Sequence, residues 1–407
     1  MISVEEAQRL VVEQASSLPP RAVPLEESLG LILAEAVASD VDSPPHDKAM
    51  VDGYAIRTAD LANGAARLAI IEEVMAGDVP LRMLGRGEAT RIMTGSPIPT
   101  GCDAVVMFER TDVVDVAGDA LGTVVIRDAP MRPGANILKQ GCSMRRGDVA
   151  LEAGCEIRPI EIGLLAEMGR STVETMPRPR VAILSTGNEL VPPEQVPARG
   201  QIRNSNGPLL AAAVARAGGI AEPLGICRDE SPALRGVISA GLRSNILVLS
   251  GGVSAGVLDL VPAVLSELGV RCVFHKVRLK PGKPLWFGVY CAGAANCLVF
   301  GLPGNPVSSL VCFELFVRPV MARLAGRMDI FPPRKQALLS RAFTHRGDRP
   351  TYHPAHLADD EGGVHVDPLK WHGSADLRAL AAANALIHFA SGDRQWMPGE
   401  SLDVLPL

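Results

Sequence analysis

The sequence predicts a multidomain α/β protein in which a doubly wound, mostly parallel sheet is joined to smaller β-rich domains. The chain has 407 residues, too many for one hydrophobic core, so about two to four domains are expected. Between residues 181 and 324, short apolar runs alternate with helical segments at the spacing of βαβ units. Residues 39–131 and 335–407 instead contain short β-like runs separated by turn-forming residues.

Residues 1–38 and 132–176 are predicted to form one N-terminal α/β domain, interrupted by an insertion. Ser3 can cap a short helix, because acidic and apolar residues follow it at helical spacing. Residues 31–38 resemble a strand. Residues 159–168 resemble a helix that has proline in its first turn.

Three further domains complete the prediction. Residues 39–131 form the inserted β-rich domain, residues 177–330 the doubly wound domain, and residues 331–407 a β-rich closing domain. Proline-rich linkers at 177–180 and 331–334 bound the central domain. Its predicted strands are 181–184, 220–226, 246–249, 270–277, 285–289 and 297–300. Its predicted helices are 206–217, 231–242, 257–268 and 306–324.

The stretch from Ile246 to Asp259 is the first candidate for a binding loop. A strand without polar residues is followed by a glycine-rich turn and then by a helix start. That arrangement presents backbone N–H groups and a positive dipole end to an anion. The spacing is neither the dinucleotide fingerprint nor a Walker A loop. We therefore predict a phosphate- or oxyanion-binding loop, the alternative being glycines that only turn a tight corner. Its candidate ligands are Ser250, Gly251, Gly252, Ser254 and Gly256.

Polar residues follow the other predicted strands as well. In a doubly wound sheet, residues just past the strand ends converge on one edge. Here they comprise three carboxylates, three lysines and a second turn that opens a helix: Glu189, Asp229, Asp259, Lys276, Lys280, Lys283 and residues 301–308. Carboxylates beside phosphate-binding groups suit Mg²⁺, and lysines suit an anion whose charge rises in a transition state. Each residue alone has an ordinary explanation, such as a helix cap or a solvated loop charge.

Composition argues against several other classes of protein. The formal net charge is −5 and aromatic residues make up 4% of the chain, so no basic, aromatic-rich stripe suggests nucleic-acid binding. No apolar run approaches the ~20 residues that span a bilayer, and the first residues do not resemble a signal peptide. Eight cysteines without a C-x-x-C pair are typical of free thiols in a reducing cytoplasm.

Histidines in the last domain raise the question of a metal site. Six of the eight histidines lie there, and His353 and His356 have a possible ligand spacing. Pro354 spoils a helical pair, however, and no cysteine or carboxylate companion is evident. Surface or hinge histidines are therefore favoured over zinc ligands.

At the level of motifs, the chain resembles the molybdopterin molybdenumtransferases, the MoeA family that includes the E domain of gephyrin. The matching motifs occur in family order along the whole chain. They are Pro44-Pro45-x-Asp47 with Asp52-Gly-Tyr-Ala55, Met93-Thr-Gly95 with Gly101-Cys-Asp-Ala-Val-Val106 and Glu109, Ser185-Thr-Gly-Asn-Glu-Leu190, Arg203-Asn-Ser-Asn206, Ser250-Gly-Gly-Val-Ser254 with Asp259, Lys280-Pro-Gly-Lys-Pro284, and Gly301-Leu-Pro-Gly-Asn-Pro-Val-Ser308.

The resemblance implies an elongated homodimer of four-domain subunits that works in molybdenum cofactor biosynthesis in the cytoplasm. It implies Mg²⁺-dependent hydrolysis of adenylylated molybdopterin as molybdate is inserted, giving molybdenum cofactor and AMP. A molybdopterin adenylyltransferase is the implied donor of that substrate. The family also implies that the β-rich domain of one subunit faces the doubly wound domain of its partner.

Site roles implied by the resemblance fall on matching positions of this chain. Asp52 and Thr94 resemble a functional pair of the β-rich domain. Glu189, Asp229 and Asp259 resemble acidic residues for phosphoanhydride cleavage, with Glu189 and Asp259 as the Mg²⁺ ligands. The implied anion- and cofactor-binding residues are Lys276, Lys280, Lys283, Pro284, Ser205, Asn206, Gly304, Asn305, Ser308, Arg349 and Ser374.

Some positions depart from the family pattern. Ser143 stands where a carboxylate is common, Pro354 stands where a second arginine is common, and the serine-rich stretch is reduced to Gly373-Ser374. Two alternatives stay open beside the molybdate-inserting enzyme: a tungstate-inserting paralogue, and a non-catalytic scaffold of the gephyrin E-domain type. The charged set of Asp52, Glu189, Asp259 and Lys280 argues against the scaffold.

Overall fold

The computed structural model describes residues 1–114, 121–127, 129–252, 260–292 and 295–407. The chain divides into two compact units. The first comprises residues 1–34, 154–158 and 172–407, and the second comprises residues 35–153 and 159–171. In the described residues, no helix combines the length and the apolar character that crossing a membrane requires.

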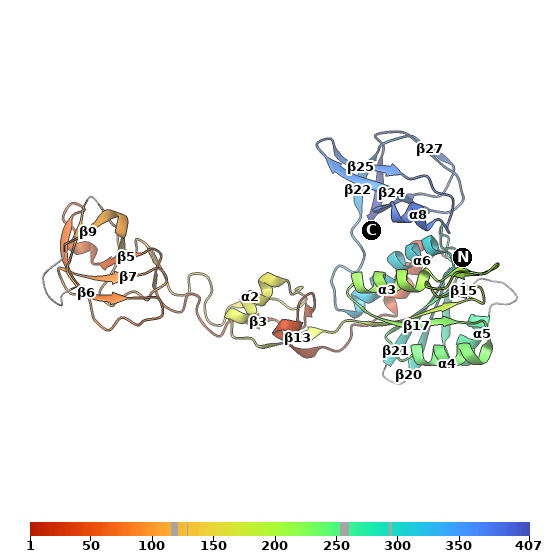
Figure 1. Cartoon of the computed structure of the whole chain (residues 1–407), viewed down its shortest axis with the longest axis horizontal. Coiled ribbons are helices and arrows are strands. Elements are labelled where there is room, and N and C mark those ends of the chain that lie inside the picture. Colours follow the sequence, from red (N-terminus) through yellow and green to blue (C-terminus); the bar gives the residue numbers. More distant parts are fainter. Residues whose placement is uncertain (115–120, 128, 253–259, 293–294) are drawn as a thin grey trace. The chain divides into compact units, whose positions relative to one another are not determined.

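A six-stranded sheet lies at the centre of the first unit (Figure 1). Its order is β17-β14-β18-β21-β20-β19. The strands are β14 (Arg180–Thr186), β17 (Ile220–Cys227), β18 (Ile246–Ser250), β19 (Arg271–His275), β20 (Trp286–Ala292) and β21 (Ala295–Leu302). The first four in the order are parallel, as predicted, whereas β20 pairs antiparallel with both of its neighbours. Among the described residues, no helix lies between β19 and β20 or between β20 and β21.

Both faces of this sheet are covered. Successive side chains of a strand point to opposite faces, so an uninterrupted apolar strand contributes to a core cluster on each side. In β14, Val181 and Ile183 belong to one core cluster and Ala182 and Leu184 to another. Helices α3 (Asn206–Arg216), α6 (Pro306–Cys312) and α7 (Arg318–Leu324) contribute to the first cluster, and α4 (Ser231–Gly241) and α5 (Leu260–Glu267) to the second. Figure 1 shows α3 and α6 on one face of the sheet, with α4 and α5 on the other. The doubly wound prediction is confirmed.

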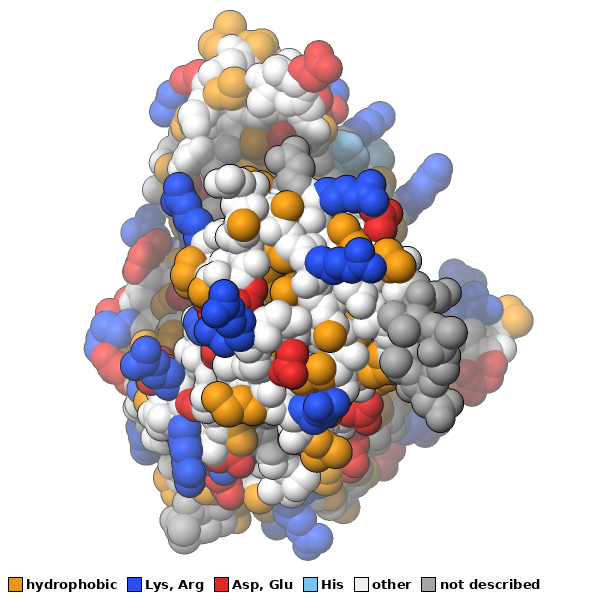
Figure 2. Space-filling view, turned by 90° about the vertical axis from the view of Figure 1, so that its left-hand side faces the viewer, with side chains coloured by type: hydrophobic (Ala, Val, Ile, Leu, Met, Phe, Trp, Pro, Cys, Tyr) orange, Lys and Arg blue, Asp and Glu red, His pale blue; other side chains and the backbone are white. Residues whose placement is uncertain are grey.

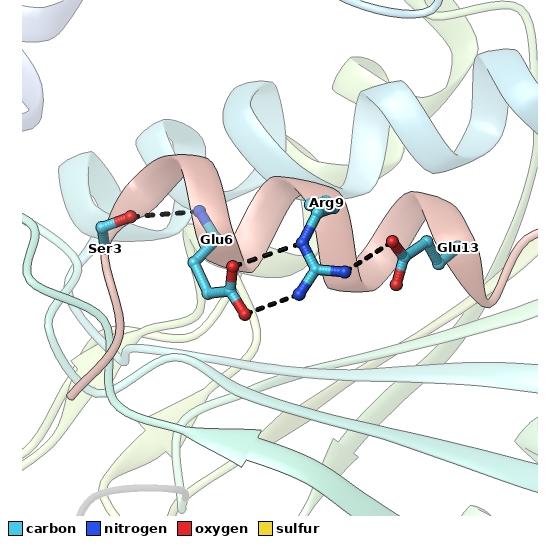
Figure 3. A network of polar contacts seen from close by, with 4 residues as sticks. All are labelled: Ser3, Glu6, Arg9 and Glu13. Carbon is cyan, nitrogen blue, oxygen red and sulfur yellow. Dashed lines mark hydrogen bonds and ion pairs between the residues drawn. The ribbon is translucent and has the colours of Figure 1, made fainter.

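Helix α1 (Val4–Glu13) packs on the first cluster through Val4, Ala7 and Val11. The predicted cap is confirmed, since Ser3 Oγ accepts a hydrogen bond of 3.1 Å from the Glu6 N–H. On the solvent side, Arg9 bridges Glu6 and Glu13 (Figure 3). These are exposed i,i+3 and i,i+4 pairs, each worth a few tenths of a kcal/mol.

The helical segment 306–324 is interrupted in its middle. A π-helical turn, Phe313–Val317, joins α6 to α7. Its residue Glu314 is completely buried. The Glu314 carboxylate accepts hydrogen bonds from Arg216 of α3 on one oxygen and, at 2.7 Å, from Arg318 on the other.

A small closed barrel contains the C-terminal residues of the first unit. Its strands, in barrel order, are β22 (Lys335–Leu339), β25 (Gly363–Pro368), β24 (Thr351–Asp360), β26 (Ala385–Phe389) and β28 (Ser401–Pro406). A short helix, α8 (Leu377–Ala381), lies between β25 and β26 in the chain. Two short strands, β23 (Phe343–His345) and β27 (Arg394–Trp396), pair beside it. His353 of β24 is buried, and its Nε2 donates to the Leu369 carbonyl at 2.9 Å.

The predicted strand 31–38 is wrong as one element. β2 (Ile32–Leu33) pairs with β13 (Thr172–Met176), which also pairs with β1 (Arg21–Pro24), whereas β3 (Val37–Ala38) pairs with β12 (Val149–Leu151). The chain thus leaves one sheet and enters another within three residues, and each piece meets a different partner. Local propensity carries no information about such a change of partner.

A second six-stranded sheet, of order β8-β5-β7-β6-β10-β9, forms the centre of the second unit. Its strands are β5 (Gly53–Ile56), β6 (Ala66–Val74), β7 (Glu88–Ile92), β8 (Ala104–Met107), β9 (Thr111–Val114) and β10 (Thr123–Ile126). The unit also contains β4 (Lys48–Ala49), β11 (Ile137–Leu138) and α2 (Pro159–Glu167). In the face drawn in Figure 2, basic and acidic side chains are interspersed, without an extended area of one sign.

Candidate functional site

The strand directions bring the predicted residues of the central sheet to one edge. β14, β17, β18 and β21 are parallel, and two antiparallel steps make β19 run the same way. β20 runs in the opposite direction, so the turn 276–285 that precedes it starts and ends at this edge. The carboxyl ends of parallel strands are where α/β sheets bind ligands.

A cavity of about 720 Å³, here called the edge cavity, lies at this edge. A cavity of this size suits a small-molecule ligand. Ten of the predicted site residues line it: Glu189, Ser205, Asn206, Asp229, Ser250, Gly251, Gly252, Pro284, Gly304 and Asn305. They come from the end of β18, from the loops after β14, β17, β18 and β21, from the turn 276–285 and from the start of α3.

Asn206 holds three of these segments together. Its Nδ2 donates to Ser250 Oγ at 2.6 Å and to the Gly304 carbonyl at 2.7 Å. Because a carbonyl only accepts hydrogen bonds, the Gly304 contact fixes which way the amide faces. Asn204 ties the same loop to β14, accepting from Ser185 Oγ and from the Gly207 N–H, both at 3.0 Å.

The turn after β18 needs its glycines. Gly251 and Gly252 have φ angles of +91° and +64°. A Cβ at Gly251 would lie 2.4 Å from the Thr186 carbonyl oxygen, and one at Gly252 would lie 2.6 Å from Thr186 Oγ1. These glycines therefore allow β14 and the turn to approach closely. The predicted ligands Ser254, Gly256 and Asp259 lie outside the described residues.

Two of the three predicted carboxylates line the edge cavity. Glu189 is exposed. Among the described residues, no basic side chain forms an ion pair with its carboxylate. Asp229 is half-buried, and its backbone N–H donates to Asn188 Oδ1 at 3.2 Å. Within the part of the chain that the structure describes, no three His, Cys, Asp or Glu side chains gather as a metal cluster. Two carboxylates in an oxygen-rich cavity still fit Mg²⁺, which keeps several waters and uses substrate phosphates as ligands.

A second cavity of about 460 Å³, here called the lysine cavity, adjoins the first. The two cavities share Pro284, Pro303 and Asn305 in their linings. The predicted residues that line the lysine cavity are Lys280, Lys283, Pro284, Asn305, Ser308, Arg349 and Ser374. Three of these are cations and two are hydroxyls, a set that suits a small oxyanion.

Residues of the barrel domain complete the lysine cavity. Arg349 Nη1 donates to the Leu279 carbonyl at 3.1 Å. Asn305 Nδ2 donates to Ser374 Oγ at 2.8 Å, and the Val307 N–H donates to the Ser374 carbonyl at 3.1 Å. These bonds fix Arg349 and Ser374 against the sheet edge, although they lie far from it in sequence.

Lys276 is also a predicted site residue at the edge of the central sheet. It lines neither the edge cavity nor the lysine cavity. It adopts a left-handed φ of +76°, and its N–H donates to the Leu285 carbonyl at 2.8 Å. This backbone conformation is rare for a residue with a side chain. The structure accordingly gives Lys276 a turn-forming position.

In the second unit, Asp52 and Thr94 form a direct pair. Asp52 Oδ1 accepts one hydrogen bond from the Thr94 N–H and another from Thr94 Oγ1, both at 2.7 Å. The backbone bond, and then the hydroxyl bond, lowers the pKa of Asp52. Asp52 precedes β5 and Thr94 follows β7, and these strands are paired.

Sequence reasoning missed several residues that line the two cavities. Thr186 is the last residue of β14, and nothing in an apolar strand pattern distinguishes it. Trp371 also lines the lysine cavity. The available signal is the motif Ser185-Thr-Gly-Asn-Glu-Leu190, which contains Thr186 and from which the prediction takes only Glu189 as a site residue.

A larger crevice of about 830 Å³ lies elsewhere in the first unit and contains none of the predicted residues. Arg178, Arg216, Arg318 and Arg327 line it. Glu314 holds Arg216 and Arg318, and Glu156 holds Arg327. The residues selected from the motifs line the two adjoining cavities instead.

Comparison with known proteins relates the whole chain to one family. Residues 2–169 match the MoeA N-terminal region (domains I and II), residues 182–323 a probable molybdopterin binding domain, and residues 336–407 the MoeA C-terminal region (domain IV). A molybdopterin molybdenumtransferase of Staphylococcus aureus is 35% identical over 412 residues, which is 99% of this chain and 95% of the relative. Molybdopterin molybdenumtransferase 2 of Mycobacterium tuberculosis is 32% identical over the full length of both chains.

Solved structures agree with this relationship. A molybdopterin biosynthesis MoeA protein of Pyrococcus horikoshii has a TM-score of 0.83 at 32% identity, covering 100% of this chain and 99% of that one. A second structure from the same organism has a TM-score of 0.80 at 27% identity, covering both chains completely. The chain therefore belongs to the molybdopterin molybdenumtransferase (MoeA) family of molybdenum cofactor biosynthesis enzymes.

Proposed function

We propose that this protein inserts molybdate into adenylylated molybdopterin, with Mg²⁺-dependent hydrolysis of the substrate, to give molybdenum cofactor and AMP. One observation carries the proposal. A cavity lined by carboxylates, amides and a glycine turn adjoins a cavity lined by lysines, an arginine and hydroxyls, and the two share Pro284, Pro303 and Asn305. The carboxylates, amides and glycine turn of the first cavity suit a phosphoanhydride, and the cations and hydroxyls of the second suit a metal oxyanion.

The edge cavity is proposed to hold the adenylylated molybdopterin. Ser250, the turn at Gly251 and Gly252, and Ser205 before α3 supply hydroxyl and N–H donors to its phosphates. Glu189 and Asp259 would hold Mg²⁺, and Asp229 would act beside them in phosphoanhydride cleavage. When bound, Mg²⁺ neutralises the phosphate oxygens and favours cleavage of the phosphoanhydride. Water adds to phosphorus, the P–O bond to the leaving phosphate breaks, and AMP is released.

The lysine cavity is proposed to hold molybdate, a tetrahedral dianion. Lys280, Lys283 and Arg349 supply positive charge, and Ser308 and Ser374 supply hydroxyl groups. As the two dithiolene sulfurs bind molybdenum, one molybdate oxygen leaves as water with the two thiol protons. The neighbouring cations stabilise the negative charge that passes through this site.

We also propose that the protein works as a homodimer, in which the Asp52–Thr94 pair serves the edge cavity of the partner subunit. Support comes from the charged state of Asp52, which two hydrogen bonds stabilise on an exposed surface. A molybdopterin adenylyltransferase is proposed as the donor of the adenylylated substrate.

Release of AMP tests this function and its alternatives. Purified protein is incubated with adenylylated molybdopterin and Mg²⁺, and then with molybdate or tungstate in separate reactions. The proposal expects AMP with molybdate, a tungstate-inserting enzyme would give more AMP with tungstate, and a scaffold would give none with either. The Asp259→Asn variant should fold normally and release no AMP, and wild-type rates in that variant would refute the role of Asp259.

Ser143, which stands at the position of a common family carboxylate, provides a second test. It is exposed, and its N–H donates to the Ser43 carbonyl at 3.0 Å. We propose that activity survives without this carboxylate because Mg²⁺ is held at Glu189 and Asp259. If the wild type were inactive and Ser143→Asp restored AMP release, the chain would instead be a degenerate member of the family.

A further inference from the structure

One short segment at the start of β24 holds two cations of the lysine cavity. Lys280 lies beside Thr351 in a parallel bridge. The Lys280 N–H donates to the Pro350 carbonyl at 2.9 Å, and the Lys280 carbonyl accepts from the Tyr352 N–H at 2.8 Å. Arg349, the second cation, directly precedes this segment. The position of Thr351 therefore decides where the side chains of Lys280 and Arg349 leave the backbone.

Thr351 is anchored in turn by a buried histidine. Thr351 and His345 of β23 are each 3% exposed. His345 Nε2 lies 2.8 Å from Thr351 Oγ1, and His345 Nδ1 lies 2.9 Å from the Gly392 carbonyl oxygen. Because a carbonyl only accepts hydrogen bonds, Nδ1 carries the proton and donates to Gly392. In the neutral ring Nε2 is then an acceptor, and the Thr351 hydroxyl donates to it.

This direction of donation fixes the Thr351 side chain. Its oxygen also lies 3.3 Å from the Arg349 carbonyl oxygen, but a hydroxyl has a single hydrogen to donate. The His345 ring takes that hydrogen over the shorter of the two distances. The ring nitrogen, and not the carbonyl of Arg349, thus holds the side chain in place.

The barrel domain holds the histidine ring on several sides. The ring stacks on Phe389 of β26, with centroids 5.6 Å apart and planes 18° apart. His345 pairs with Arg394 of β27 in the strand ladder, and the Gly392 N–H donates to the Gly347 carbonyl at 2.8 Å. A ring fixed in this way can pass the rigidity of the barrel on to Thr351.

We propose that His345 is a positioning residue of the lysine cavity, which acts through Thr351 on the segment that carries Arg349 and pairs with Lys280. His345 does not line the cavity itself, so its effect on a bound oxyanion passes through Thr351. A displacement of about 1 Å is enough to weaken the contacts of such a site. This role rests on the proposed function, because it requires that the lysine cavity holds molybdate.

Two variants of His345 separate the roles of its two ring nitrogens. His345→Gln places its amide near the position of Nε2 and keeps an acceptor for Thr351. His345→Asn places its amide near the position of Nδ1 and keeps only the bond to Gly392. Binding of sodium molybdate is measured by calorimetry, and binding of molybdopterin by pterin fluorescence.

His345→Asn should raise the Kd for molybdate about tenfold, because displaced cations lose charge-assisted hydrogen bonds to the oxyanion. The Kd for molybdopterin should not change, and His345→Gln should bind both ligands as the wild type does. A histidine with only a structural role would weaken both ligands together. Amide exchange at Lys280 and Tyr352 should also become faster in ligand-free His345→Asn, since their bonds flank Thr351.

Variants of Thr351 test the path from the histidine to the cavity. Thr351→Val removes the hydroxyl and should raise the Kd for molybdate by the same factor as His345→Asn. Thr351→Ser keeps the hydroxyl and should bind as the wild type does. Combining Thr351→Val with His345→Asn should add no further loss, because both changes remove one and the same bond. Additive losses would contradict a path through Thr351.

The possible outcomes separate this role from the proposed function. Wild-type protein that binds neither ligand would overturn the proposed function, and wild-type protein that binds molybdopterin without molybdate would overturn the oxyanion role of the lysine cavity and this role with it. Wild-type molybdate binding with an unchanged Kd in His345→Asn would overturn the positioning role and leave the function standing. If His345→Asn does not fold, Thr351→Val compared with Thr351→Ser decides the same question.

Discussion

Thr94 donates two hydrogen bonds of 2.7 Å to a single oxygen of Asp52, one from its N–H and one from its hydroxyl. Both favour the charged carboxylate, and the pKa of Asp52 is lowered. Since the folded pKa lies below the unfolded one, this contribution to stability is present above the unfolded pKa. It is lost as pH falls through the folded pKa.

We expect Thr94→Val to raise the pKa of Asp52 part of the way toward its ordinary value. The backbone bond remains in that variant, and Thr94→Ser should leave the pKa low because it keeps both bonds. An NMR titration of the Asp52 carboxyl carbon measures the shift. Asp376, whose pKa is lowered by the Ala379 and His372 N–H groups, serves as an internal control. Equal pKa values for Asp52 in the wild type and Thr94→Val would contradict the assigned role of the hydroxyl.

A site shared between subunits can be tested with two inactive variants. Asp52→Asn and Glu189→Gln are produced together with different tags, and the heterodimer is purified by both tags in succession. If Asp52 serves the partner's cavity, one of the two sites contains both wild-type residues, and about half of the wild-type turnover is expected. Sites built within single subunits would leave every site damaged, so an inactive heterodimer that still binds molybdopterin would contradict sharing.

The glycine turn predicts a strong effect of one methyl group. Gly251→Ala places Cβ 2.4 Å from the Thr186 carbonyl oxygen, a contact that neither backbone can relieve without moving. Strain at a left-handed residue and the clash should together lower the free energy of unfolding by about 2–3 kcal/mol. Gly304→Ala is the matched control, since the nearest atom to its Cβ would be 3.9 Å away. Equal urea midpoints for the two variants would contradict the close approach.

Glu314 predicts a non-additive effect at the π-helical turn. Its carboxylate is fully buried between Arg216 and Arg318. Replacing one arginine by methionine leaves the other as a partner, whereas replacing both leaves a buried charge unpaired, which costs about 3–5 kcal/mol. Urea unfolding should therefore show a double-variant loss larger than the sum of the single losses. Adding Glu314→Gln to the double variant should restore most of the stability, and strictly additive losses would argue against a coupled buried charge.

Much of the edge cavity could be predicted from sequence because strand order and direction follow from the βαβ pattern. Glu189, Asp229 and Ser250 lie at or just past the carboxyl ends of parallel strands, so topology alone brings them together. Arg349 and Ser374 were assigned by resemblance, because the barrel loops that bring them to the sheet edge depend on distant contacts such as Asn305 with Ser374.

Other features depended on interactions that a one-dimensional pattern does not contain. The strand 31–38 divides because its two halves meet β13 and β12, which lie far along the chain. Thr186 looks like any strand residue in the sequence. Its place in the lining of the edge cavity is visible only once every neighbouring atom is placed.

Coupling between AMP release and molybdenum insertion tests the central claim most directly. In a single turnover of wild-type protein with adenylylated molybdopterin, Mg²⁺ and molybdate, both AMP and pterin-bound molybdenum are measured over time. The two adjoining cavities predict equal amounts of each, and Glu189→Gln should lower both together. AMP release without molybdenum bound to the pterin would show a plain hydrolase and contradict the account.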